Sequence, residues 1–202
     1  MSNGRPTNRS LPHAAFRPAP DASAHERAAL ARAEDFFSYW SALPRADTQR
    51  APHLRTLLDN PAPPLQPAIA LVDVVPPASL PVRLFGSERE AAFGLNITRR
   101  DALDFYAPHL RRAVFARAAC VVEQPVGWLT RRLITSTRGS SVRFLSLSLP
   151  LAVDSGAPPV VVNFGAAMDR QPNEDFPARV NAISGGAWLD LGAGVPALPP
   201  GV

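Results

Sequence analysis

The sequence contains one cysteine, no lysine and no long uninterrupted apolar segment. Because Cys120 has no second cysteine to pair with, an intrachain disulfide is excluded, and the chain fits a reducing compartment. No apolar run reaches the roughly 18 residues that a membrane-spanning helix requires. The N-terminus also lacks the apolar core of a secretory signal. We therefore expect a soluble cytoplasmic protein without a membrane partner.

The basic residues are all arginine, and 21 of them against 17 acidic residues give a formal net charge of +4. A nucleic-acid interface usually needs basic side chains clustered on one face, with aromatic or base-reading groups between them. Here the arginines are spread along the chain, and the doublets are limited to Arg99-Arg100, Arg111-Arg112 and Arg131-Arg132. We expect scattered, solvated arginines and no nucleic-acid partner.

Length and composition predict one domain with flanking segments. A chain of 202 residues that is 46% hydrophobic can bury a substantial core. Repeated prolines discourage regular structure in residues 1–22, which we predict to be a disordered arm. We place the folded domain at residues 23–168. Residues 169–202 are predicted to be an irregular tail with a few apolar side chains that dock on the domain.

An amphipathic helix is predicted at the start of the domain. Ser23 and Glu26 have the spacing of a capping box, in which the serine oxygen accepts a hydrogen bond from a free N–H group. Leu30, Phe37 and Trp40 recur at helical spacing and form an apolar stripe. This stripe can pack on the sheet of the same chain or form a dimer or partner face, and the sequence leaves both alternatives open.

A strand that ends at a glycine and passes at once into a helix is the most informative local pattern. An apolar, β-branched run at residues 68–75 comes before it and predicts a buried strand. Residues 80–85 predict a second, antiparallel strand. Gly86 then allows a sharp exit into a helical turn at residues 87–93, with Ser87 as the capping residue.

Further elements are predicted from periodicity and from proline positions. Short helices are expected at residues 53–58 and 101–105, followed by a long helix that starts at Pro108 and ends before Pro125. Three strands follow, at residues 128–137, 142–151 and 160–167.

The second of these three strands has an irregular hydrophobic pattern. Alternate leucines contrast with Ser146 and Ser148, but the alternation slips between Phe144 and Leu145. This slip indicates either a β-bulge or burial on both faces of the strand.

The order of these elements and five short motifs resemble one protein family. In order and spacing the motifs are similar to those of the small bacterial PAS-like family known from alphaproteobacteria, over roughly residues 33–167. The chain departs from the family pattern at residues 98–100, where a glycine usually follows the threonine. The motifs are Phe37-Ser-Tyr-Trp40, Ala70-Leu-Val-Asp73-Val74, Arg83-Leu-Phe-Gly86-Ser87, Phe93-Gly94 and Leu147-Ser-Leu-Pro150-Leu151.

The resemblance implies an α+β fold, with a five-stranded antiparallel sheet, helices on one face of it and the N-terminal amphipathic helix. It also implies a sensory or regulatory module that does no chemistry itself. Such a module binds a small molecule between sheet and helices, or acts through a homodimer or a partner signalling protein. The alternative is a cofactor-bearing, haem-type sensor or a carrier of small ligands, and the sequence identifies no particular cofactor.

Side chains on the helix-facing side of the sheet would line a pocket in such a fold. We predict that the lining residues are Phe85, Phe93, Val114, Leu147 and Asn163, with plain core packing as the alternative. Polar residues of the later strands, such as Arg132, can orient a ligand if they face inward. The period of two alone does not identify the inward face.

No catalytic or metal-binding constellation is present in the sequence. His109 opens the long helix, where haem-binding PAS domains carry the iron ligand, but a single histidine favours a surface role. Cys120 lies among apolar residues and does not match the flavin-adduct motif, which favours an inert thiol. Gly192 and Gly194 fit a dinucleotide-binding pattern, but the prolines behind them prevent the required helix. We expect no enzymatic activity, no catalytic residue and no metal site.

Overall fold

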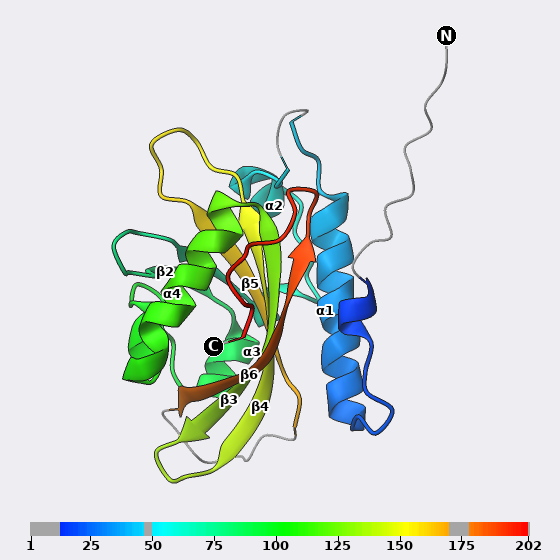
Figure 1. Ribbon diagram of the computed structural model, residues 1–202, viewed down its shortest axis with the longest axis vertical. Helices are drawn as coiled ribbons and strands as arrows, with labels where there is room; N and C mark the ends of the chain where they lie inside the picture. Colours follow the sequence, from blue (N-terminus) through cyan, green and yellow to red (C-terminus); the bar gives the residue numbers. More distant parts are fainter. Residues whose placement is uncertain (1–12, 47–49, 170–177, 202) are drawn as a thin grey trace.

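The structure of the chain is a computed structural model that describes residues 13–46, 50–169 and 178–201. Over these residues, six strands form one antiparallel sheet with helices on both of its faces (Figure 1). The spatial order of the strands is β2-β1-β5-β4-β3-β6. The strands are β1 (Ile69–Asp73), β2 (Val82–Phe85), β3 (Val126–Ser136), β4 (Ser141–Leu151), β5 (Val160–Ala167) and β6 (Ala178–Asp190).

The helices form a layer on each side of the sheet. α1 (Ala24–Ala42) covers one face, and α3 (Ser87–Phe93) and α4 (Pro108–Glu123) cover the other (Figure 1). Each face therefore buries its own apolar core. None of the helices in the described residues is long and apolar enough to cross a bilayer. The shorter helices are α2 (Leu54–Asp59) and the 3₁₀ helices η1 (His13–Phe16), η2 (Gln66–Ala68) and η3 (Ala102–Phe105).

The predicted α+β class and the five predicted strands are confirmed, and the sheet has a sixth strand. Residues 178–190 form β6, although we predicted an irregular segment there. Gly185 and Gly186 lower the intrinsic strand preference of this stretch. β6 forms because it pairs with β3 over the whole length of β3. Gly185, with a φ of 69°, is skipped in that pairing and takes the left-handed conformation that suits glycine.

The segment before α1 is more ordered than the predicted arm at residues 1–22. Residues 1–12 of that prediction lie outside the described part of the chain. Residues 13–16 form η1, and Phe16 is only 3% exposed. Its ring packs on Phe37 with a centroid separation of 5.7 Å. The disordered arm is therefore wrong for the residues next to the domain, because Phe16 completes the core under α1.

α1 begins at the predicted cap and packs on the sheet of its own chain. The Oγ atom of Ser23 accepts a hydrogen bond from the backbone N–H of Glu26 at 3.1 Å. On the buried face, Phe36 stacks on Phe164 of β5 with ring centroids 5.4 Å apart. The indole N–H of Trp40 donates to the carbonyl oxygen of Pro150 in β4 at 3.1 Å.

The structure corrects the alternative in which Leu30, Phe37 and Trp40 form a dimer or partner face. These side chains are 1%, 2% and 2% exposed and belong to the core between α1 and the sheet. A single sequence does not distinguish an apolar stripe that meets its own sheet from one that meets a second copy. The helix covers the sheet face opposite α4, so both faces of the central strands are buried.

Gly86 has a different role from the one that the local pattern suggests. Its φ of −70° is ordinary for any residue, so conformational freedom is not required there. A β-carbon at this position would instead overlap the carbonyl oxygen of Pro67. Gly86 is also the residue that precedes α3, and Ser87 is the first residue inside the helix. The glycine allows β2 and η2 to approach closely, and the predicted Ser87 cap is wrong.

The segment after β6 folds back over β3, β6 and α4. The indole N–H of Trp128 in β3 donates to the carbonyl oxygen of Pro200 at 2.9 Å. The indole N–H of Trp188 in β6 donates to the carbonyl oxygen of Leu198 at 2.7 Å. Arg117 of α4 donates to the carbonyl oxygen of Gly201. Three side chains from three elements therefore anchor this segment.

We expect Phe37→Ala to lower the free energy of unfolding by about 3–5 kcal/mol, because it removes a buried ring from the core under α1. Chemical denaturation followed by circular dichroism measures this loss. Val195→Ala is the control, and since Val195 is 53% exposed its effect should stay within about 0.5 kcal/mol. A Phe37→Ala protein that kept its stability but lost a dimer would contradict the intramolecular packing.

An ion-pair cluster at the start of α1 gives a pH-dependent prediction. Arg143 of β4 contacts Asp169 at 2.7 Å (Nη2 to Oδ1) and Glu26 at 3.2 Å (Nη1 to Oε2). The hydrogen bond from Arg143 lowers the pKa of the Asp169 carboxyl below its usual 3.8. A lowered folded-state pKa means that the stabilisation is complete above pH 3.8 and is lost as the pH falls through the lowered value.

We expect Asp169→Asn to lower the free energy of unfolding by roughly 0.5–1 kcal/mol at pH 6–7, because these partly exposed charges are screened by solvent. The difference from the wild type should vanish in the acid range below pH 3.8. Urea denaturation at a series of pH values measures both quantities. Asp35→Asn on exposed α1 surface is the matched control. A loss of stability that is equal at pH 6 and pH 2 would contradict the ion-pair explanation.

Candidate functional site

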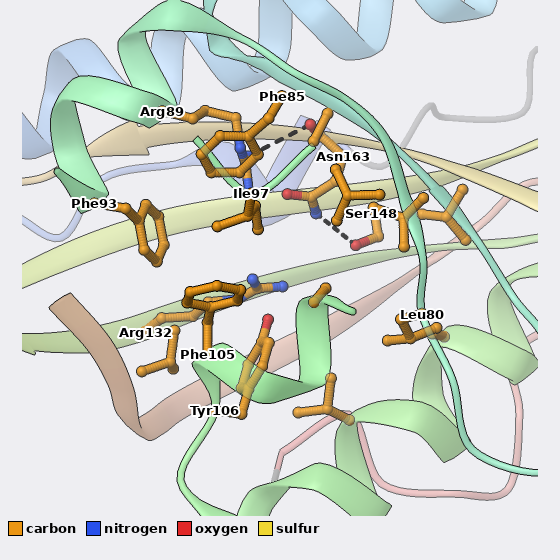
Figure 2. Close-up of a pocket in the computed structure, with 18 of the residues that line it drawn as sticks. Leu80, Phe85, Arg89, Phe93, Ile97, Phe105, Tyr106, Arg132, Ser148 and Asn163 are labelled. Atoms are coloured by element: carbon orange, nitrogen blue, oxygen red, sulfur yellow. Dashed lines mark hydrogen bonds between the residues drawn. The ribbon is translucent and has the colours of Figure 1, made fainter. Parts of the chain in front are cut away.

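A cavity lies between the sheet and the helical layer formed by α3, η3 and α4 (Figure 2). Its volume is about 70 Å³. Most of the wall is aliphatic or aromatic, with side chains from β1, β2, β3, β5 and the three helices. The polar members of the wall are Arg89, Tyr106, Arg132, Ser148 and Asn163. A mostly apolar cavity with a few convergent polar groups is the usual form of a small-molecule site.

Four of the five predicted pocket residues lie in this wall: Phe85, Phe93, Val114 and Asn163. Leu147 does not, because it belongs to the core on the α1 side of the sheet. β4 pairs with both β3 and β5 without a register shift, so its side chains alternate strictly between the two faces. The slip in the hydrophobic pattern therefore reflects burial on both faces, with Phe144 on the cavity side.

The sheet side of the cavity carries a buried hydrogen-bond network. The side-chain amide of Asn163 in β5 donates to Ser148 Oγ at 2.7 Å and to Ser146 Oγ at 2.8 Å. All three residues are at most 6% exposed. These bonds use both amide N–H groups of Asn163, whereas the Ser148 hydroxyl is used only as an acceptor within the described residues. The Ser148 hydroxyl proton therefore remains available for a group in the cavity.

Arg89 reaches the cavity from α3 and is 5% exposed. Its Nη1 atom donates to the carbonyl oxygen of Asn163 at 3.5 Å, and its Nε has no hydrogen-bond partner within the described residues. The guanidinium lies 5.2 Å from the ring centroid of Phe85 and 5.7 Å from that of Phe144. A β-carbon on Gly165 in β5 would overlap Arg89 Nη1 and the Phe144 ring. The glycine therefore leaves the space that this buried guanidinium occupies.

Arg132 of β3 is the second buried guanidinium and is 6% exposed. Its Nε donates to Thr130 Oγ1 at 3.4 Å, and its Cζ atom lies 5.4 Å from the Tyr106 ring centroid. In Figure 2 the Arg132 guanidinium and the Tyr106 hydroxyl point toward the middle of the cavity. Neither Arg89 nor Arg132 forms an ion pair with a carboxylate in the described part of the chain.

The protonation of Arg89 is affected by its burial. Removal from solvent, followed by repulsion from the charge on Arg132, lowers the pKa of the Arg89 guanidinium to about 9. The side chain still carries its charge at neutral pH, because the pKa remains above 7. Two positive charges therefore face one small cavity, and no carboxylate among the described residues pairs with either of them.

The expectation of scattered, solvated arginines is wrong for these two residues and for Arg117, which is 7% exposed. The sequence does indicate the burial of Arg132. Trp128, Thr130 and Arg132 are spaced two residues apart, so they lie on the same face of β3. Arg89 was missed by sequence reasoning. It stands between Glu88 and Glu90 in a short helix, and that charged sequence is typical of an exposed surface.

The other residues considered for cofactor chemistry lie outside the cavity wall. His109 is exposed on the first turn of α4. Cys120 is half-buried, and burial raises the pKa of its thiol. A higher pKa disfavours the reactive thiolate, as expected for an inert cysteine. Within the described residues, no three His, Cys, Asp or Glu side chains lie close enough together to hold a metal ion.

We expect Arg89→Met to raise the free energy of unfolding of the ligand-free protein by roughly 1–4 kcal/mol at pH 7, because a buried charge without a counter-ion is replaced by an apolar chain of similar length. The folded-state pKa of Arg89 lies below its unfolded-state value, so the wild type regains this stability as Arg89 loses its proton. The difference should therefore shrink above pH 9. Arg132 and Tyr106 face the same group and remain in both proteins.

Chemical denaturation between pH 7 and pH 10 tests this expectation. Arg117→Met is the control, because Arg117 is buried outside the cavity and donates to the carbonyl oxygens of Ala113 and Gly201. Its removal should lower stability. If Arg89→Met were also destabilising at pH 7, the guanidinium would have to be paired within the protein.

Comparison with known families gives a match over most of the folded part of the chain. A family model described as a PAS domain matches residues 29–166, from the first turns of α1 to the end of β5. The match includes Arg89, Arg132 and Asn163 and excludes β6 and the segment after it. No curated protein matches the chain.

Proposed function

The chain belongs to the PAS domain family, and we propose that it is a non-catalytic regulatory module that binds a small molecule between its sheet and helices. PAS domains are in general sensory or regulatory modules. The binding event is expected to alter how the chain associates with a second copy or with a partner signalling protein. Membership of the family alone implies only the sensory or regulatory role.

The observation that carries this proposal is the set of buried polar groups turned into an otherwise apolar cavity. Buried charges in folded proteins are normally paired, because an isolated one is costly to remove from water. Arg89 and Arg132 lack such a partner within the described residues. A core selected for packing alone would fill this space with apolar side chains. A bound molecule that supplies the missing interactions explains why they are retained.

The proposed output surface lies next to the cavity. Phe85 lines the cavity and also a surface groove between α1, α2 and β2. Leu58 and Leu84 line the same groove and are 54% and 39% exposed. Exposed apolar side chains of this size favour a protein contact. A ligand that shifts Phe85 would therefore change the groove from within, and we place the dimer or partner contact there.

Native mass spectrometry of the freshly purified full-length chain, with and without compounds from a small-molecule library, tests this proposal. We expect one bound molecule per chain. We also expect the bound molecule to change how the chain associates with a second copy or a partner. Ala118→Leu should abolish binding, because Ala118 lines the cavity and a larger side chain fills it. Ala116→Leu on the same helix is the matched control and should bind normally.

A protein that stays monomeric, captures no partner and binds no compound would contradict the proposal. A Soret or flavin absorbance band in the purified protein would instead support the cofactor-bearing sensor.

A further inference from the structure

We propose that the ligand of the cavity is a small organic anion, a short-chain carboxylate held by the guanidinium groups of Arg89 and Arg132. This inference rests on the proposed function, because it names the chemical class of the molecule that the module binds. It follows from the charges that face the cavity, from the hydrogen-bond donors that lack acceptors, and from the size of the cavity.

The acidic residues nearest to Arg89 in sequence do not neutralise it. Glu88 forms an ion pair with Arg32 of α1, with 2.9 Å between Oε2 and Nη2. Glu90 accepts a hydrogen bond from the side-chain amide of Asn96 at 3.2 Å. Both carboxylates are thus engaged outside the cavity, and the cavity wall contains no acidic residue from the part of the chain that the structure describes. The negative charge that would balance Arg89 and Arg132 must come from a molecule other than the described protein.

The two guanidinium groups hold more donors than the protein uses. Each arginine has five N–H groups. Within the described residues, Arg89 makes one hydrogen bond, of 3.5 Å, and Arg132 makes one, of 3.4 Å. A carboxylate accepts two parallel N–H bonds from a guanidinium fork, and it gains most where water is excluded. The donors therefore match a carboxylate in number, charge and planar geometry.

The size of the cavity limits the ligand. A volume of about 70 Å³ corresponds to roughly five water molecules, so a ligand with about four to six non-hydrogen atoms fits. Phe93, Val114 and other apolar side chains form the remaining wall, which suits a short hydrocarbon body. Of the remaining polar wall residues, Asn163 already uses both of its amide N–H groups on Ser146 and Ser148, which leaves the hydroxyls of Tyr106 and Ser148. A hydroxyl or oxo substituent beside the carboxylate can bond to them.

The protein architecture keeps Arg89 in place without a counter-ion. Gly165 provides the space for the guanidinium, and the rings of Phe85 and Phe144 flank it. The donors are thus pre-organised before any ligand arrives, which reduces the cost of ordering on binding. A bound anion also removes the penalty of the unpaired charge, so binding should stabilise the fold.

The test uses the full chain, with isothermal titration calorimetry and thermal denaturation at pH 7. The probes are lactate, pyruvate and propionate, with lactamide and propionamide as neutral counterparts of the same shape, and inorganic phosphate as a second anion. We expect the carboxylates to bind and to raise the melting temperature, and the amides to have no effect. Tighter binding of phosphate than of every carboxylate would overturn the carboxylate class.

The variants locate the binding site. Arg89→Met and Arg132→Met should each weaken carboxylate binding by about 10- to 100-fold, since each removes charge-assisted hydrogen bonds. Arg89→Lys should recover part of the loss, because it keeps the charge without the fork. Gly165→Ala should weaken binding with Arg89 still present, because the new methyl group displaces the guanidinium. Arg117→Met, outside the cavity, should stay within about twofold of the wild type.

The outcomes separate this inference from the proposed function. Carboxylate binding that survives both Arg89→Met and Arg132→Met overturns the inference. Binding of neutral or cationic compounds that Ala118→Leu abolishes, with no binding of carboxylates, also overturns it but leaves the proposed regulatory function standing. A protein that binds nothing and associates with nothing contradicts both.

Discussion

The unbroken pairing of β4 with β3 and β5 is the constraint on which the rest of the structure depends. Because neither pairing has a register shift, each residue of β4 has a fixed face. Leu145, Leu147, Leu149 and Leu151 all turn toward α1. Ser146 and Ser148 must then turn toward α4, where they meet Asn163 of β5. One apolar face and one partly polar face follow from the same register.

The two faces of the sheet serve different purposes. The α1 face is a close-packed core, in which Phe36 stacks on Phe164 and Trp40 bonds to the β4 backbone. The α4 face contains a cavity and two buried guanidinium groups that have no counter-ion among the described residues. Burying these charges costs free energy. The close-packed α1 face supplies stability that offsets the cost of burying these charges on the α4 face. This division is common where a binding site is built into a small domain.

Sequence patterns predicted much of the fold but less of the candidate site. The strands and α4 carry strong periodicity, and the pocket residues on β2, α3, α4 and β5 followed from it. Leu147 was placed on the wrong face, because the apolar Phe144 obscured the strict alternation of β4. β6 was missed, because its glycines weaken the local signal and its pairing partner is distant in sequence. The burial of Arg89 depends on the space at Gly165, which only tertiary structure brings beside it.

The anchoring of the segment after β6 means that the structural unit is longer than the region matched by the family model. β6 and residues 198–201 lie beyond residue 166, yet they hold one wall of the cavity in place through Trp128. A fragment cut at residue 166 would leave β3 as an exposed edge strand, with its N–H and C=O groups open to unwanted pairing. Expression boundaries for this protein should therefore be chosen by the sheet and its two tryptophan anchors, and family boundaries alone would produce an aggregation-prone fragment.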